Sequence, residues 1–299
     1  MGRFPIKVAS LGKQIDMISK SMDIDNAQSI GEGYFNFFKG SGLEFKGYRE
    51  YTLSDDSKNI DWKASLRSDK VLVKEFFREK GIDVIFVYDV SDSMLFGSEK
   101  KVKAHYGAEF ILTLAGTAIE SNYNVGLICF SDEIKKSFLP ASGQNQVGLF
   151  FDVLGNHSTY GGKFDLTDTL MYIDANFTPG SIIILVSDFL GNKIPFNKFE
   201  NKFKQISKKF DFITVLLRDP RDEFMPSDNM DIVVSDLDGR GELLFNTKKI
   251  KKKYEEYSKK QREQLVKFLL DVRSECFELY TNKSYVEESL AFFKRRKYY

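Results

Sequence analysis

Along residues 81–299, two patterns of hydrophobic and polar positions alternate. Short uninterrupted apolar runs are typical of strands buried on both faces. Between them, longer segments carry apolar residues at helical spacing. Strands that alternate with helices favour βαβ units, a largely parallel sheet and right-handed crossovers. The pattern therefore predicts a doubly wound α/β fold, with strands over residues 84–88, 124–130, 134–138, 181–186, 212–217 and 277–280, and helices over 102–119, 199–210 and 249–273.

The first 80 residues have a different pattern, which is rich in glycine and aromatic residues. We expect an N-terminal aromatic-rich, β-containing extension, residues 1–80, that packs on an α/β domain of residues 81–299. Segment 44–67 of this extension is dense in charge around the only tryptophan of the chain. Its charges can brace the first core strand, form a docking surface for a partner, or belong to a solvated loop. The residues singled out are Arg49, Asp55, Asp56, Asp61 and Trp62.

Polar residues follow the central apolar run at alternate positions, as Asp89, Ser91 and Ser93. In an open α/β sheet, ligands bind beyond the carboxyl ends of the strands. One carboxylate and two hydroxyls are hard oxygen donors, which suit Mg²⁺ or Mn²⁺. The alternative is a polar turn without a ligand, because Asp and Ser are common turn residues.

Later loops supply further oxygens for the same edge of the sheet. Asp188 follows the strand expected over 181–186, and a glycine-bearing loop and the start of the next helix precede that strand. Because the carboxyl ends of parallel strands meet at one edge, these loops are expected to converge on one cation. The predicted ion is Mg²⁺ or Mn²⁺, and its candidate ligands are Asp89, Ser91, Ser93, Asp188, Thr159, Asp165 and Thr167.

The composition narrows the function classes. Lys and Arg number 44 against 43 Asp and Glu, a net charge of +1 that offers no general attraction to nucleic acid or an anionic membrane. Cys129 and Cys276 are the only cysteines, which fits a reducing compartment and no zinc site. No apolar run approaches the roughly 20 residues of a membrane span. We therefore expect a cytoplasmic protein with no nucleic-acid partner and no membrane span.

The loop at 89–93 and the Ser187–Asp188 pair resemble the metal-ion-dependent adhesion site (MIDAS) of von Willebrand factor A domains. The sequence is still more similar to the DUF58 family of bacterial proteins, which carry a von Willebrand A-like domain. The most specific match is the block Asp-Asp-x-x-x-Ile-Asp-Trp at 55–62. The resemblance covers nearly the whole chain and implies a von Willebrand A-like, Rossmann-like sheet. Further matching segments are 42–45, 49–51, 72–76, 218–221, 280–282 and 292–296.

This resemblance implies a binding module rather than an enzyme. In adhesion-type sites the ion accepts an acidic side chain from a partner protein, and DUF58 proteins are often encoded beside MoxR-type AAA+ ATPases. The expected partner is therefore a MoxR-type AAA+ ATPase or another von Willebrand A-domain protein, in assembly or a chaperone-like process. One ligand departs from the family pattern. The expected threonine of the second loop would fall near Phe164, and Lys163 could take up the space of the cation.

Two alternatives stay open. The same fold can serve as a metal-free scaffold. A Mg²⁺-dependent phosphatase of the haloacid dehalogenase type also places an Asp after a first strand, but its chemistry needs a second acid two residues on, and position 91 is Ser. A serine hydrolase would need a Gly-x-Ser-x-Gly motif, which the sequence lacks. We therefore expect no catalytic residue and no enzymatic activity.

Overall fold

The computed structural model describes residues 43–52, 60–68, 70–78, 82–190, 196–225, 231–235 and 242–296. The N-terminal elements are β1 (Leu43–Glu50), α3 (Trp62–Ser65) and β2 (Leu72–Arg78). The elements that follow are β3 (Asp83–Asp89), η2 (Asp92–Leu95), α4 (Lys103–Glu120), β4 (Asn124–Phe130), β5 (Ile134–Ala141), α5 (Gln144–Leu154), η3 (His157–Thr159), α6 (Thr167–Asn176), β6 (Ile182–Ser187), α7 (Phe196–Lys209), β7 (Asp211–Arg218), α8 (Pro220–Glu223), β8 (Asp231–Ser235), β9 (Glu242–Asn246), α9 (Thr247–Asp271), β10 (Glu275–Tyr280) and α10 (Tyr285–Arg296).

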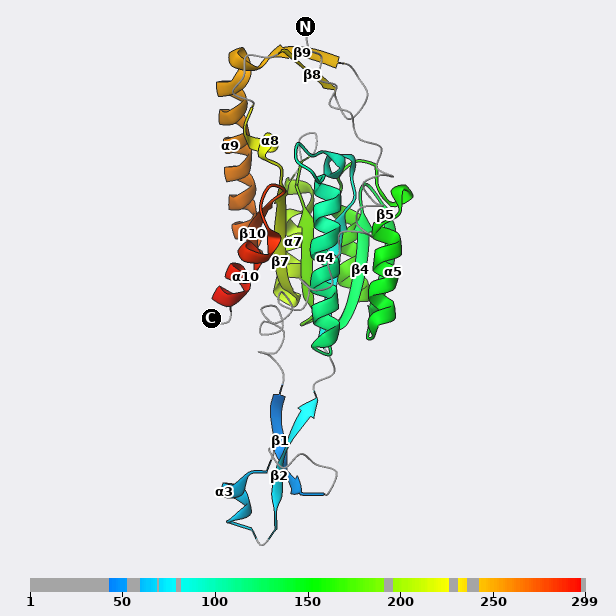
Figure 1. Ribbon diagram of the computed structural model, residues 1–299, viewed down its shortest axis with the longest axis vertical. Helices are drawn as coiled ribbons and strands as arrows, with labels where there is room; N and C mark the ends of the chain where they lie inside the picture. Colours follow the sequence, from blue (N-terminus) through cyan, green and yellow to red (C-terminus); the bar gives the residue numbers. More distant parts are fainter. Residues whose placement is uncertain are drawn as a thin grey trace.

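The α/β domain is built on one sheet of six strands in the order β10-β7-β6-β3-β4-β5 (Figure 1). All neighbouring pairs from β10 to β4 are parallel, and β5 runs antiparallel to β4. The chain places β4 on one side of β3 and β6 on the other, so the strand order reverses between β3 and β6. In such sheets ligands bind at this switch point, outside the carboxyl ends of the strands.

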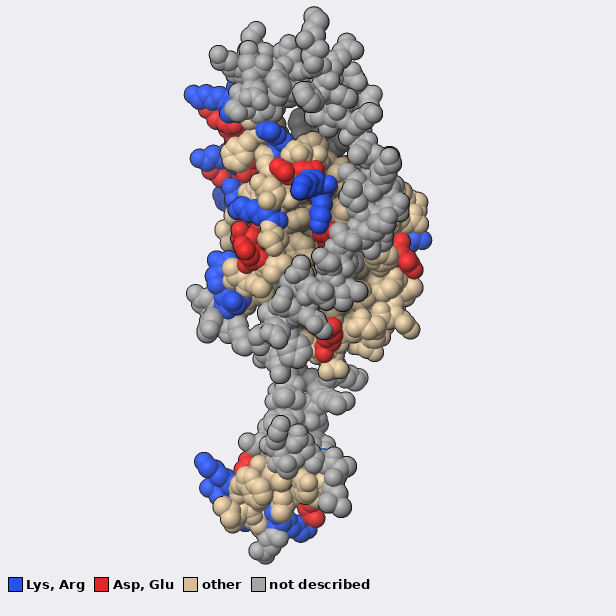
Figure 2. Space-filling view, viewed as in Figure 1, with Lys and Arg blue, Asp and Glu red and all other residues tan. Residues whose placement is uncertain are grey.

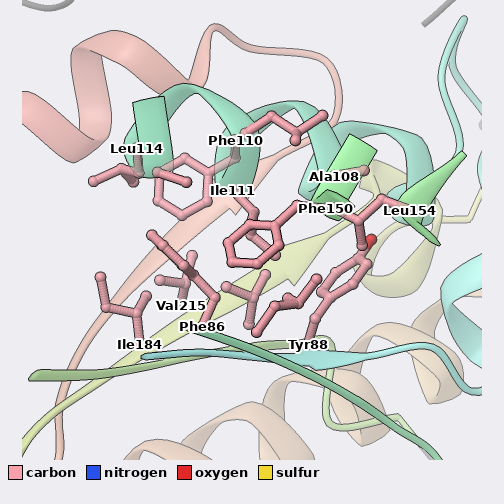
Figure 3. Packing of buried hydrophobic residues seen from close by; sticks show 14 of the residues in the cluster. Phe86, Tyr88, Ala108, Phe110, Ile111, Leu114, Phe150, Leu154, Ile184 and Val215 are labelled. Carbon is pink, nitrogen blue, oxygen red and sulfur yellow. The ribbon is translucent and has the colours of Figure 1, made fainter. Parts of the chain in front are cut away.

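Helices cover both faces of the sheet because successive strand residues point to opposite faces. Phe86 and Tyr88 point to the face covered by α4, α5 and α10, where they share a hydrophobic cluster with Phe110 of α4 (Figure 3). Ile85 and Val87 point to the face covered by α6, α7 and α9. These five side chains are fully buried, which is worth roughly 1.5–3 kcal/mol for each aliphatic or Phe side chain. Packing on both faces therefore fixes β3 and the loop that follows it.

The predicted mixed α/β class and mostly parallel sheet are confirmed. Strand β4 occupies the predicted residues 124–130, and β5, which begins at the predicted residue 134, pairs with it. The helix predicted over 249–273 is α9, which begins and ends two residues earlier.

Segment 70–78 contains the strand β2, which pairs with β1 and not with the central sheet. With α3 the two strands make a hairpin unit, which Figure 1 shows apart from the α/β domain. Residues 1–42 and 79–81 lie outside the described residues. The packing of residues 1–80 on the domain therefore stays a prediction.

The loop after β7 connects the carboxyl edge of the sheet to α9. It contains α8, and Asp219 is the N-cap of this helix and forms a capping box. The hydroxyl of Tyr254 on α9 donates to the carbonyl oxygens of Arg221 and Asp222 over 2.7 and 3.2 Å. Helix α9 extends past this edge and follows the β8–β9 hairpin (Figure 1).

Candidate functional site

The ends of β3 and β6 place two aspartates at the switch point. Asp89 is the last residue of β3, and Asp188 directly follows β6. The two strands are parallel with Tyr88 opposite Val186, so both aspartates leave the sheet at the same edge. Both are fully buried. The structure thus brings two carboxyl groups together in a region from which water is excluded.

Asp89 is held by an amide and a hydroxyl. Its Oδ1 accepts a hydrogen bond from the backbone N–H of Ser91 over 2.9 Å, and its Oδ2 accepts one from the hydroxyl of Ser187 over 2.6 Å. Complete burial and, after it, the charge of Asp188 raise the pKa of Asp89 to about 7. At neutral pH this carboxyl group is therefore divided between its protonated and ionised forms.

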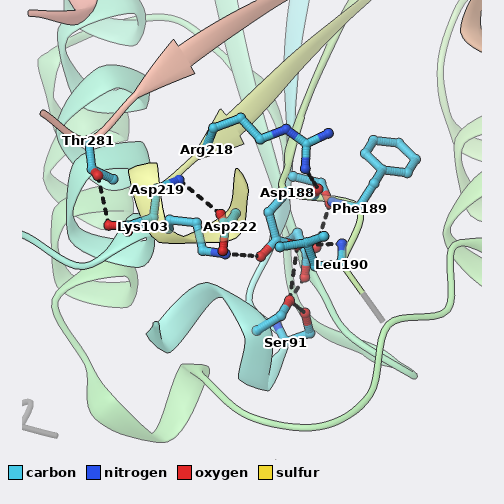
Figure 4. A network of polar contacts seen from close by, with 12 residues as sticks. Ser91, Lys103, Asp188, Phe189, Leu190, Arg218, Asp219, Asp222 and Thr281 are labelled. Atoms are coloured by element: carbon cyan, nitrogen blue, oxygen red, sulfur yellow. Dashed lines mark hydrogen bonds and ion pairs between the residues drawn. The ribbon is translucent and has the colours of Figure 1, made fainter. Parts of the chain in front are cut away.

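Ser91 and Ser93 connect the first loop to Asp188 (Figure 4). Their hydroxyl oxygens are 3.2 Å apart, and the hydroxyl of Ser93 donates to Oδ1 of Asp188 over 3.0 Å. The same Oδ1 accepts from the backbone N–H of Leu190 over 2.8 Å. The four side chains of Asp89, Ser91, Ser93 and Asp188, with these backbone groups, form one buried polar network, called here the switch-point network.

A lysine from α4 joins this network. The Nζ of Lys103 lies 2.7 Å from Oδ2 of Asp188 and 3.1 Å from Oδ2 of Asp222, and the lysine side chain is only 1% exposed (Figure 4). Burial disfavours its charged form, but the two carboxylates outweigh burial and raise the pKa of Lys103 above its ordinary value. The sequence-based prediction placed Lys163 near the cation instead, and the side chain of Lys163 is exposed. The signal for Lys103 was a lysine at the start of a largely apolar helix.

Asp219 ties three loops together beside the network. It accepts hydrogen bonds from the backbone N–H and the hydroxyl of Ser98, over 2.8 and 2.5 Å, and from the hydroxyl of Thr281 over 2.9 Å. Burial alone would raise the pKa of Asp219, but these hydrogen bonds lower it below its ordinary value. The preceding Arg218 donates from Nη1 to the backbone carbonyl of Asp188 over 2.9 Å. The segment 218–221 therefore holds the rim of the site in place.

Phe164 is the residue near which the resemblance places the threonine ligand of an adhesion-type site. Its ring packs against Phe130 and Phe189, with centroids 5.9 and 5.4 Å away. The second loop meets the first through its backbone, because the N–H of Asp92 donates to the carbonyl of Gly162 over 2.9 Å. Position 164 therefore supplies apolar packing and no side-chain oxygen.

The three other oxygens predicted from this part of the chain have different roles. The hydroxyl of Thr159 donates to the carbonyl of Val153 over 2.8 Å. Asp165 accepts from the N–H of Thr167 and pairs with Lys198 at 2.5 Å. The hydroxyl oxygen of Thr167 is buried and has no hydrogen-bond partner among the described residues. Thr159 and Asp165 thus make local contacts, and no contact found in the described chain joins Thr167 to the switch-point network. Their roles as metal ligands stay a prediction.

The charged block at 44–67 lies on the hairpin unit. Asp61 caps α3, because its Oδ1 accepts two backbone N–H groups of the first turn, and the hydroxyl of Tyr48 donates to its Oδ2 over 3.2 Å. Trp62 is 64% exposed. Arg49 donates to the carbonyl of Glu50. Two further residues of the predicted block lie outside the described residues, namely Asp55 and Asp56.

The spacing of the oxygens in the switch-point network suits a divalent cation, but other features of the network do not. The separations of 3.2 and 3.0 Å along Ser91, Ser93 and Asp188 match the roughly 3.0 Å between adjacent ligands of a six-coordinate ion at about 2.1 Å. However, Lys103 already faces Asp188, and Phe164 offers no oxygen. Within the described ranges, no three His, Cys, Asp or Glu side chains form a group that could hold a metal ion. As they are arranged here, the residues do not fit a bound metal ion.

Comparison with solved structures finds similarity at low sequence identity. The chain is similar to the conserved hypothetical protein BatB from Bacteroides thetaiotaomicron, with a TM-score of 0.50 and 15% identity, over 73% of this chain and 99% of that one. It is also similar to an aerotolerance-related membrane protein from Bacteroides fragilis, with a TM-score of 0.48 and 14% identity, over 73% of this chain and 99% of that one. At these identities the likeness to BatB concerns the fold alone. No protein with a curated description matches the chain.

The described part of the chain contains no helix with the length and apolar character needed to cross a membrane. The family model "Protein of unknown function DUF58" matches residues 47–264. This match takes in part of the hairpin unit, the switch-point network, Lys103 and the loop after β7. The chain belongs to the DUF58 family.

Proposed function

We propose that this chain is a non-enzymatic protein–protein interaction module built on a von Willebrand A-like domain. The observation that carries the proposal is the exposed apolar surface of the hairpin unit. Trp62 is 64% exposed and Leu66 is 87% exposed. Large apolar side chains exposed side by side mark interaction sites, and Trp residues are frequent anchors of such interfaces. Figure 2 shows largely uncharged surface on the described part of the hairpin unit, with Lys, Arg, Asp and Glu side chains around it.

Charge on the hairpin unit favours a partner segment with acidic residues. A hollow of about 450 Å³ is lined by Tyr48, Lys63, Arg67 and Leu72, among other residues. The carboxylate of Asp61, which also lines it, already accepts hydrogen bonds from α3 and Tyr48. The hollow therefore presents two basic side chains, Lys63 and Arg67, against the one carboxylate of Asp61, and basic charge is in excess. Complementary charge would speed association and select the partner.

The switch-point network supports a role without catalysis. An Asp nucleophile of the phosphatase type needs a reactive carboxylate and an acid nearby. Both oxygens of Asp89 accept hydrogen bonds, and position 91 is a serine. The fully buried Asp89 offers a substrate no approach from solvent.

The partner we propose is a MoxR-type AAA+ ATPase or another von Willebrand A-domain protein, acting with this chain in the cytoplasm. A rival proposal is the binding of Mg²⁺ or Mn²⁺ at Asp89, Ser91, Ser93 and Asp188, and it holds only if the wild-type chain binds Mn²⁺ through Asp188. It is favoured by the spacing of the oxygens and requires Lys103 to leave Asp188. The alternative is a metal-free scaffold with the same fold.

The test is the affinity of the full chain for a MoxR-type ATPase from the same genome, measured by isothermal titration calorimetry. Trp62→Ala and Leu66→Ala should each weaken binding by about tenfold or more, the effect of losing an interface anchor. Leu270→Ala is the matched control, because Leu270 is 67% exposed on α9. Absence of binding would contradict the proposed partner. Binding that neither hairpin substitution changes would contradict the proposed surface.

A further inference from the structure

The position of Lys103 is unfavourable on two counts. It is the first residue of the 18-residue helix α4, where the helix dipole disfavours a positive charge. It is also 1% exposed, and a buried ammonium without partners is costly. Neither helix formation nor solubility explains a lysine here. The lysine is explained by the carboxylates of Asp188 and Asp222, which it contacts.

Lys103 contacts the carboxylate that a metal ion would need. In Asp188, Oδ1 is engaged by the hydroxyl of Ser93 and the N–H of Leu190, and Oδ2 faces the ammonium at 2.7 Å. A divalent ion bound at Asp188 would place its charge against this same carboxylate. Two cations so close together repel each other strongly where water is excluded. The ammonium and the ion therefore exclude one another.

We infer that the ammonium of Lys103 takes the place of a divalent ion at the switch point, as a cation supplied by the chain itself. Ser91 and Ser93 keep the spacing of an ion site, and Asp188 keeps its carboxylate. An ammonium has three donors, whereas Mg²⁺ requires six ligands. The lack of a side-chain oxygen at Phe164 is therefore tolerated.

The ammonium also makes a connection beyond Asp188. It donates to both carboxylate oxygens of Asp222, over 3.3 and 3.1 Å. The backbone carbonyl of Asp222 in turn accepts from Tyr254 of α9. Lys103 thus joins the start of α4, the end of β6 and the α8–α9 connection. This inference concerns the α/β domain and can fail or hold independently of the hairpin surface.

The experiment titrates the full chain with Mn²⁺ and records electron paramagnetic resonance and the Tm. Wild type should bind no Mn²⁺ at the switch point and show no Mn²⁺-dependent rise in Tm. Lys103→Ala removes the ammonium and leaves room for an ion, so it should gain Mn²⁺ binding. At ten times the Kd its Tm should rise by about 3–6 °C. Lys103→Ala combined with Asp188→Asn should lose this gain.

Two results would overturn the inference. The first is Mn²⁺ binding to the wild type that Asp188→Asn abolishes, because the ammonium would then not exclude the ion. The second is a folded Lys103→Ala that binds no Mn²⁺, because the remaining oxygens would then form no cation site. Should Lys103→Ala fail to fold, the titration of wild type against Asp188→Asn decides, with no Asp188-dependent binding supporting the inference.

Discussion

Replacing Lys103 by methionine keeps most of the side chain's length and removes its charge. Lys103 lies 2.7 Å from Asp188 and 3.1 Å from Asp222, and the three side chains are 1%, 0% and 6% exposed. Removing one partner of a buried ion pair leaves uncompensated charge and costs about 3–5 kcal/mol. We expect Lys103→Met to lower the free energy of unfolding by this amount at pH 7. The loss should shrink at low pH, because protonated carboxyl groups no longer need the ammonium.

Urea unfolding followed by far-ultraviolet circular dichroism measures this loss. Fluorescence would follow Trp62, the only tryptophan, which belongs to the hairpin unit. Adding Asp188→Asn to Lys103→Met should recover about 0.5–3 kcal/mol, since the two groups interact directly. The control Lys252→Met alters a lysine that is 91% exposed and should stay within about 0.5 kcal/mol of wild type. A loss below about 1 kcal/mol for Lys103→Met, or no recovery in the double variant, would refute the reasoning.

Three further substitutions test other parts of the domain. The pKa of Asp89 is raised to about 7, so between about pH 4 and 7 the folded chain keeps a proton that the unfolded chain loses. The free energy of unfolding should therefore fall with rising pH by at most about 1.4 kcal/mol per pH unit. Asp89→Asn should flatten this pH dependence in thermal unfolding. An unchanged pH dependence would contradict the raised pKa of Asp89. Gly107→Ala would bring a Cβ within 2.7 Å of Leu217 and should lower the free energy of unfolding, measured in urea, by about 1–3 kcal/mol. Gly116→Ala on the same helix meets open space and should raise it by up to about 1 kcal/mol. Equal effects of the two substitutions would contradict the close packing at Gly107. Asp219→Asn should lower the free energy of unfolding by about 1.5–3 kcal/mol, because it weakens hydrogen bonds to a charged group. The control Asp271→Asn changes an exposed residue and should leave the free energy of unfolding unchanged. No effect of Asp219→Asn would show that Asp219 holds no loop in place.

The core strands could be predicted from sequence because a strand that is buried on both faces is an uninterrupted run of apolar residues. The run Val84–Tyr88 is apolar at every position, and it lies in β3 at the centre of the sheet. Asp89 and Asp188 could be placed at one edge for a related reason, since parallel strands end together.

Lys103 and the hairpin unit could not be predicted in the same way. Lys103 reaches Asp188 because the segment between η2 and α4 folds back, with the N–H of Lys103 donating to the carbonyl of Phe96 over 3.1 Å. That path depends on tertiary packing, which local patterns do not encode. Likewise the composition of β2 indicates a strand, but the choice of β1 as its partner depends on long-range pairing and register.

The covalent attachment of Lys103 has a consequence for control of the domain. A dissociable ion responds to its concentration outside the protein, so chelators or competing metals can empty or refill its site. A side chain fixed by its own backbone has a constant effective concentration at its acceptors. A change in metal concentration would therefore not regulate this protein through the switch point.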